Sequence, residues 1–179
     1  MERGTFLPAL GLVIASVAML VVPVWVNASV AAPVVEPGHR ETLTDPYGGQ
    51  IVGELDPLAG WQVTARSGAR SLTLARDRAT VTIKVVSNVT DLERWFNRQA
   101  RTILLSEREV NVCRTGDYVT PTGLPGLHGE LRGSRTGEIY LVGRPGGTAY
   151  GVQLSGPPGQ WEHTRDDVRQ VVDTVEVTQ

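Results

Sequence analysis

The chain has little cysteine, few aromatic residues and no excess of positive charge. Cys113 is the only cysteine, so no disulfide can form within the chain, and it lies too far from the N-terminus to be a lipid-attachment cysteine. Because Val110 and Val112 lie beside it, we expect Cys113 to fill a small gap in the core. Aromatic residues make up only 6% of the chain, so we expect a core of Val, Leu, Ile and Ala. A net charge of −2 argues against a polycationic nucleic-acid binder, and a hydrophobic content of 41% argues against disorder.

Charged side chains are also absent from the run Phe6–Val26. A helix of that length, at 1.5 Å of rise per residue, covers about the 30 Å hydrocarbon core of a bilayer. We therefore predict a transmembrane anchor at residues 1–27, in contact with the lipid bilayer. The protein is then a single-pass plasma-membrane protein with an extracytoplasmic C-terminal domain. The small residues of Ala28–Ala32 leave a cleaved signal peptide as the alternative, although signal-peptide apolar runs usually span only about 7–15 residues.

The next stretch, residues 28–54, is rich in small residues and proline and has no sustained apolar periodicity. We expect a linker there, with a short strand possible from Gln50 onward. Residues 55–179 remain for one exported domain of about 125 residues, which is long enough to bury a single core.

Between residues 61 and 85, apolar and polar side chains alternate in three short runs, which is typical of half-buried antiparallel strands. The three predicted strands form a meander: Trp61–Arg66, Leu72–Leu74 and Ala79–Val85. In the first of them the side chains expected to face inward are Trp61, Val63 and Ala65.

A helical period follows. Thr90 and Glu93 have the spacing of a capping box, which predicts a helix over Asp91–Leu105. Its apolar stripe, expected to pack on the sheet, consists of Leu92, Trp95, Phe96, Ala100, Ile103 and Leu104.

The second half contains a further meander after an irregular stretch, Ser106–Gly126, in which glycine and proline interrupt the pattern. Val110, Val112 and Tyr118 are candidates for a short strand within that stretch. The three expected strands are Leu127–Leu131, Ile139–Leu141 and Tyr150–Leu154. Thr164 then caps a final helix, and residues 175–177 form a short extended end. The buried stripe of this helix is Val168, Val171, Val172 and Val175. The fold class is α+β: an antiparallel sheet of two three-stranded meanders packed with two helices.

This order resembles the PsbP-like fold, in particular the LpqN-type envelope proteins of actinobacteria. The residues that carry the resemblance are Gly60-Trp61, the Leu72–Val85 hairpin, the Leu92–Leu104 helix and the segment from Pro145 to Asp173. The resemblance implies an exported accessory or binding protein and supplies no active-site residues. The lipoprotein members carry an N-terminal lipid-modified cysteine, and this chain has the run Phe6–Val26 in its place.

Catalytic and metal-binding patterns are weak. The histidines lie at no metal-ligand spacing; they are His39, His128 and His163. His128 and Glu130 share the outward face of one predicted strand, yet no nucleophile motif accompanies them, which favours a solvated strand face over an acid–base pair. Ser134 and Ser155 lack the glycines of a nucleophile elbow. We therefore expect no enzyme, no cofactor and no metal.

Arg94, Arg98 and Arg101 are the candidate interaction surface, because i, i+4 and i+7 spacing places them on one face of the helix. Such a face suits anionic headgroups or an acidic partner, although Glu93, Glu107 and Glu109 dilute its charge in the sequence, which favours an ordinary solvated face.

The expected function is a non-enzymatic binding or scaffolding module for an envelope or membrane protein. Gly11 and Ala15 are spaced for close helix packing in the bilayer, which favours a membrane-protein partner. The alternative is a lipid or small-ligand carrier, with a pocket between the sheet and the Thr90 helix or beneath Ser106–Gly126.

Overall fold

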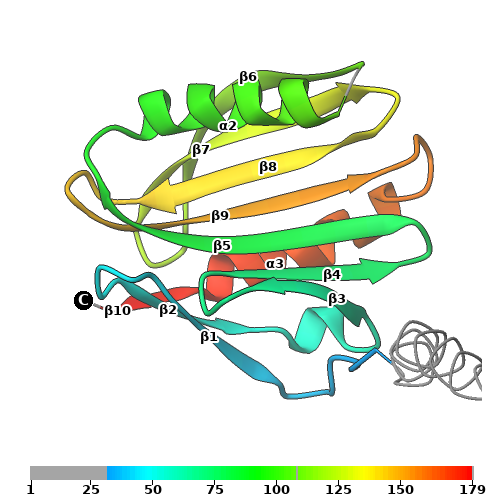
Figure 1. Ribbon diagram of the computed structural model, residues 1–179, viewed down its shortest axis with the longest axis horizontal. Helices are drawn as coiled ribbons and strands as arrows, with labels where there is room; N and C mark the ends of the chain where they lie inside the picture. The colour runs from blue at the N-terminus through cyan, green and yellow to red at the C-terminus, as the bar shows by residue number, and fades with distance from the viewer. Residues whose placement is uncertain (1–31, 108, 179) are drawn as a thin grey trace, which may run out of the picture. The chain divides into compact units, whose positions relative to one another are not determined.

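The computed structural model describes residues 32–107 and 109–178, and within them seven strands form one antiparallel sheet (Figure 1). In space the strands run β3-β4-β5-β9-β8-β7-β6, so the pairing of β5 with β9 joins the two halves of the chain. In chain order these strands are β3 (Gln62–Ser67), β4 (Ser71–Arg76), β5 (Ala79–Val89), β6 (Val110–Val119), β7 (Pro125–Gly133), β8 (Thr136–Gly143) and β9 (Gly147–Gly156).

The described residues also form a smaller antiparallel sheet, in the order β1-β2-β10. Its strands are β1 (Arg40–Thr44), β2 (Gln50–Glu54) and β10 (Glu176–Thr178). The linker prediction for residues 28–54 is therefore wrong from Pro33 onward, because β1 and β2 belong to the folded unit and bury Leu43 and Ile51 in its core. A short helical turn, η1 (Asp56–Leu58), connects this sheet to β3.

The helix α3 (Arg165–Thr174), preceded by the turn η2 (Glu162–Thr164), shares this core with the smaller sheet. Its expected valine stripe is confirmed, since Val168, Val171, Val172 and Val175 are all buried. Thr164 does not cap the helix with its side chain; its hydroxyl donates to the carbonyl of Trp161 instead, at 2.7 Å.

The helix α2 (Leu92–Ser106) lies over β6, β7 and β8 (Figure 1), where it closes a second core with Trp95, Phe96 and Ile103. Asp91, not Thr90, is the N-cap: its carboxylate accepts from the backbone N–H of Arg94 at 3.1 Å. The apolar stripe predicted to pack on the sheet is correct except for its last residue.

Leu104, the last residue of that stripe, is 49% exposed.

Two strands differ from their predicted form. The irregular stretch after α2 contains the ten-residue β6, which makes the second meander four strands long. In β3 the expected inward alternation fails after Val63, because the pairing register shifts there and Ala65 is exposed on the outermost strand. Trp61 is fully buried, as expected.

The anchor predicted at residues 1–27 lies outside the described residues. Within the two described ranges, no helix is both long enough and apolar enough to span a membrane.

Candidate functional site

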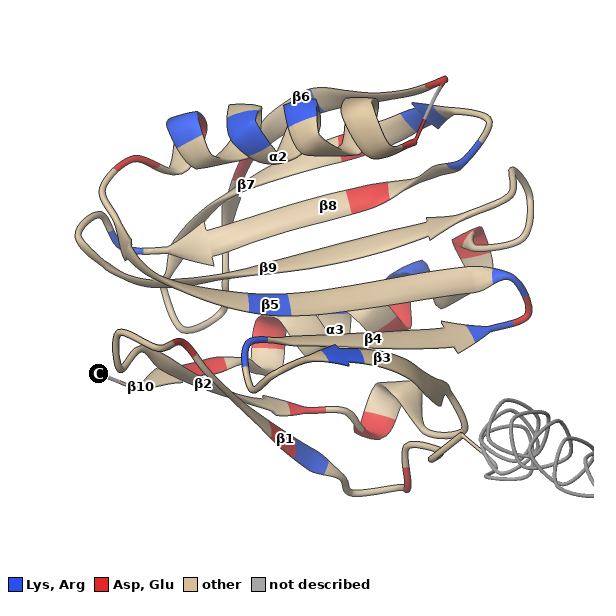
Figure 2. Ribbon diagram, viewed as in Figure 1, with Lys and Arg blue, Asp and Glu red and all other residues tan. Residues whose placement is uncertain are grey.

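The outer side of α2 carries the arginine face, which comprises Arg94, Arg98 and Arg101. All three residues are exposed, and α2 shows a row of positive bands away from the sheet (Figure 2). No ion pair joins these guanidiniums to another residue in the described part of the chain. Leu105, eleven residues after Arg94 and therefore on the same side of the helix, is 75% exposed.

Two of the three acidic residues near this face in sequence are bound elsewhere. Glu93 pairs with Arg114 of β6, and the Glu107 carboxylate lies 3.7 Å from Nε of Arg135. These pairs reduce the dilution of charge expected from the sequence, so the arginine face is more strongly cationic than the order of residues suggests.

A second feature, which we call the β10 groove, lies beneath the connection between β6 and β7. It is a cavity of about 520 Å³, a volume within the usual range for ligand sites. It is lined by Thr122, Leu124, Arg144, Gly147, Thr148, Val175, Glu176, Val177 and Thr178. The second position expected for a pocket, beneath Ser106–Gly126, therefore does hold one. A smaller cavity of about 160 Å³ lies at the start of α2, beside Arg94 and Arg98.

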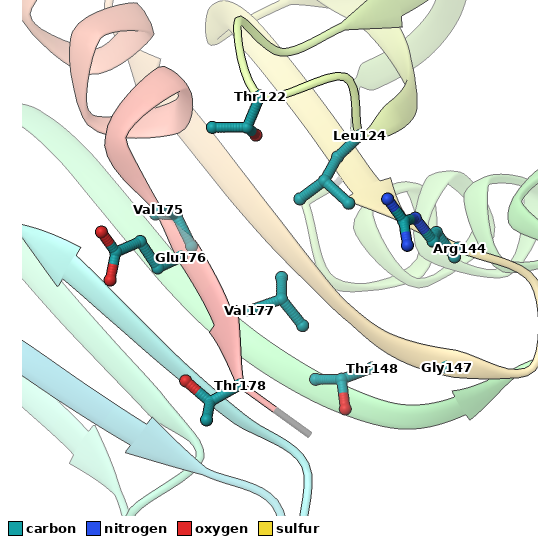
Figure 3. A pocket seen from close by; sticks show the side chains of 9 residues that line it. All are labelled: Thr122, Leu124, Arg144, Gly147, Thr148, Val175, Glu176, Val177 and Thr178. Atoms are coloured by element: carbon teal, nitrogen blue, oxygen red, sulfur yellow. The ribbon is translucent and has the colours of Figure 1, made fainter.

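The lining of the β10 groove combines apolar and polar groups. Val177, Leu124 and Thr148 point toward the same space, and the Arg144 guanidinium lies at its side (Figure 3). Glu176 points away from this space, as alternation along a strand requires (Figure 3). Sequence reasoning recognised the extended end at residues 175–177 but gave no signal of what lies opposite it.

His128 and Glu130 lie two residues apart on β7, but each contacts a different partner. Glu130 pairs with Arg132 at 2.8 Å. His128 stacks on Tyr140 at 4.6 Å, accepts or donates a hydrogen bond with the Thr115 hydroxyl at 2.8 Å, and lies with its Nε2 3.7 Å from the carboxylate of Glu138.

Glu138 of β8 is the centre of this cluster, since its side chain is only 6% exposed. It accepts from the Tyr140 hydroxyl at 2.7 Å, and Nε of Arg165 lies 2.7 Å away. Burial alone raises the pKa of Glu138, but the contacts with His128, Tyr140 and Arg165 outweigh it and hold the pKa below its usual range. The carboxylate is fully engaged with neighbours of the protein itself, which is the arrangement of a structural ion-pair network.

The side chains of Lys84 and Cys113 are the remaining candidates for reactive groups, and neither has a catalytic partner among the described residues. Lys84, the only lysine in the chain, lies partly buried beside Trp95 and donates to the Gln99 side-chain amide. Burial lowers its pKa to about 8. Cys113 is exposed, contrary to the core position expected for it, because it and the half-buried Val112 alternate on the outermost strand β6. Among the described residues, no cluster of three or more His, Cys, Asp or Glu side chains is placed to hold a metal ion.

Comparison with known proteins identifies the architecture. No protein-family model and no curated protein matches the chain. Among solved structures, the cyanobacterial PsbP protein CyanoP of Synechocystis sp. PCC 6803 is similar over 84% of this chain and 99% of its own, with a TM-score of 0.52 and 12% identity. The fold is PsbP-like. The expected fold family is thereby confirmed, and at this identity the similarity concerns the fold alone.

A weaker similarity links the PsbP-like domain to a protein of Bacteroides thetaiotaomicron. It covers 72% of this chain and 45% of the other, with a TM-score of 0.40 and 13% identity.

Proposed function

We propose that the chain is a membrane-anchored envelope protein of the LpqN type, from an actinobacterium, whose PsbP-like domain is exported and acts as a non-enzymatic binding or scaffolding module. The observation that supports this proposal most directly is the arginine face of α2. Its guanidiniums are exposed and without ion pairs to described residues, while the acidic residues Glu93 and Glu107 are paired with other arginines.

The partner that suits this surface is an acidic protein of the envelope or membrane. Arginine forms bidentate hydrogen bonds with carboxylates and is enriched at protein interfaces, so exposed and unpaired arginines on one helix face suit an acidic partner. The exposed Leu105 adds an apolar contact to the same face.

The location is tested with a reporter fused after Gln179 that is active only outside the cytoplasm, combined with the intact mass of the membrane-extracted chain. We expect activity and an uncut N-terminus. An inactive reporter contradicts export, and a mass that lacks the first 30 or so residues means a cleaved signal instead of an anchor.

The docking surface is tested by in-cell crosslinking of the full chain. The double variant Arg94→Glu/Arg98→Glu is expected to lose the crosslinked adducts that the unmodified chain forms with envelope proteins. The control, Arg70→Glu/Arg78→Glu, changes the charge equally at exposed arginines of the β3–β4 and β4–β5 connections and is expected to keep them. Adducts that persist in the first variant contradict the proposed surface. If that variant instead loses binding to phosphatidylglycerol vesicles, the partner is the bilayer surface.

The carrier function is the second candidate, and the β10 groove is the observation that favours it. A cavity of about 520 Å³ with Leu124 and Val177 in its lining has room for a small apolar ligand. Mass spectrometry of small molecules that copurify with the full chain tests this candidate, with Val177→Asp expected to lose any such ligand.

A further inference from the structure

The strand β10 has an open edge. It is the outermost strand of the smaller sheet and is bonded on one side to β2. The strand also borders the β10 groove, since Glu176, Val177 and Thr178 all line that cavity, and β9 lies close by. Successive residues of an antiparallel strand direct their N–H and C=O groups to alternate sides, so at least one residue of β10 directs both groups away from β2.

Open edges are normally protected, and the long outer strand β6 of the main sheet illustrates how. Its register shifts between Arg114 and Gly116, and its middle carries the charged side chains of Arg114 and Asp117. Both devices hinder the addition of another strand. The strand β10 is protected by its length of only three residues, but it pairs with β2 without such a shift, and Val177 in its middle faces the groove (Figure 3).

The groove offers two further contacts to a chain lying along β10. Leu124 and Val177 give the groove an apolar position, and Thr148 lies beside them (Figure 3). Arg144 lies next to this position and forms no ion pair with a described residue, so its charge is available to a carboxylate.

We propose that the β10 groove binds an extended peptide segment, which adds to β10 as a further strand. An apolar side chain of the peptide packs between Leu124 and Val177, and an acidic side chain or a C-terminal carboxylate binds Arg144. Backbone pairing supplies the affinity and these two positions supply the specificity, as in other cases of strand addition.

A peptide fits this surface better than a second folded copy of the chain does. The cavity is recessed, with the β6–β7 connection at Thr122 on one side and, on another, Arg144 of the β8–β9 connection and Gly147 at the start of β9. A single extended chain is narrow enough to enter such a recess. The β10 edge of a second copy is flanked by the same connections, which would collide with those around the groove. The inference does not depend on the arginine face, so the two proposals fail separately.

The experiment selects a displayed library of random eight-residue peptides on the full chain in detergent. We expect the selected peptides to share an apolar residue next to an acidic one. Arg144→Glu is expected to weaken their binding about tenfold, the loss typical of one charge-assisted hydrogen bond. Replacing the acidic residue of the peptide by arginine is expected to restore binding to that variant. Val177→Asp is expected to abolish binding, while the matched controls Arg78→Glu and Val34→Asp, at exposed positions away from the groove lining, leave it unchanged.

Strand addition is tested separately with N-methylated peptides. Methylating every second backbone nitrogen in one register is expected to abolish binding, and methylating the alternate nitrogens is expected to preserve it, because only one set faces β10. The proposal is overturned if no peptide is enriched, if both methylated sets bind equally, or if Arg144→Glu binds the selected peptides as the unmodified chain does. Double reversal at Arg94 and Arg98 is expected to leave peptide binding intact.

Discussion

At the scale of single residues, the Glu138 carboxylate is a buried and charged group held by several partners. Its side chain is nearly inaccessible, yet it is charged and satisfied by Tyr140 and Arg165. Removing one partner of a buried ion pair leaves the remaining groups without compensation, which costs more than the pair contributes as a whole.

Glu138→Gln is therefore expected to lower the free energy of unfolding at pH 7 by about 1–3 kcal/mol, measured by urea denaturation. Glu130→Gln is the matched control, because Glu130 pairs with Arg132 at the exposed end of its strand; it should change stability by less than about 0.5 kcal/mol. Equal losses in the two variants would mean that the Glu138 network does not stabilise the fold.

The pKa of Glu138 fixes how this effect depends on pH. Folding lowers the pKa of Glu138 from its ordinary value of 4.5, so the folded protein binds this proton less readily than the unfolded chain. The contribution of the charged carboxylate is complete above pH 4.5 and is lost as the pH falls through the lowered value. The difference between the unmodified chain and Glu138→Gln is thus expected to shrink in acid, and a difference that stays constant down to pH 2 contradicts the assignment.

At the scale of elements, the packing of α2 on the sheet needs a glycine beneath Phe96. A methyl group at Gly129 of β7 would lie 2.5 Å from the Phe96 ring, closer than any packed side chain allows. Gly129→Ala is expected to destabilise the domain by about 1–3 kcal/mol. Gly116→Ala on the adjacent strand is the control, since its new methyl group would meet nothing within 4 Å.

Phe96→Leu tests whether the clash is the cause. Shortening this side chain vacates the space above residue 129, so the double variant is expected to lose less stability than the two single losses added together. Strict additivity, measured by thermal unfolding of all four proteins, would place the effect of Gly129→Ala elsewhere.

The sequence predicted the elements whose information is local. The helical period of α2 and the valine stripe of α3 could be predicted from residues close together in the chain. The exposure of Arg94, Arg98 and Arg101 could be predicted in the same way. The full length of β6 escaped prediction because its Gly116-Asp117 pair is typical of a turn. In the structure the strand accommodates Gly116 beside a shift in register.

Features that depend on pairing between distant segments could not be predicted. His128 was considered with Glu130 because they are two residues apart, whereas its carboxylate contact is Glu138 on the neighbouring strand, a position set by the register of β7 and β8. The β10 groove escaped for the same reason, since its lining combines residues around 122, 144 and 177.

At the scale of the whole described unit, β1 and β2 complete the core against which α3 and β10 pack. Val35, Leu43 and Ile51 are each at most 4% exposed in that core, and β10 pairs with β2 alone. Residues 33–54 thus contribute both apolar burial and the pairing partner of the last strand, and a boundary at residue 55 cuts through the fold.

A fragment of residues 55–179 is therefore expected not to fold cooperatively. Burying one large aliphatic side chain contributes about 1.5–3 kcal/mol, so the loss of Val35, Leu43 and Ile51 is comparable with a typical total stability of about 5–15 kcal/mol. The matched fragment, residues 33–179, keeps all three and should unfold in a single transition. Urea denaturation followed by Trp fluorescence compares the two, because Trp61 and Trp161 lie buried in this core. A shorter fragment with the same midpoint as the longer one would show that β1 and β2 do not contribute to the stability of the domain.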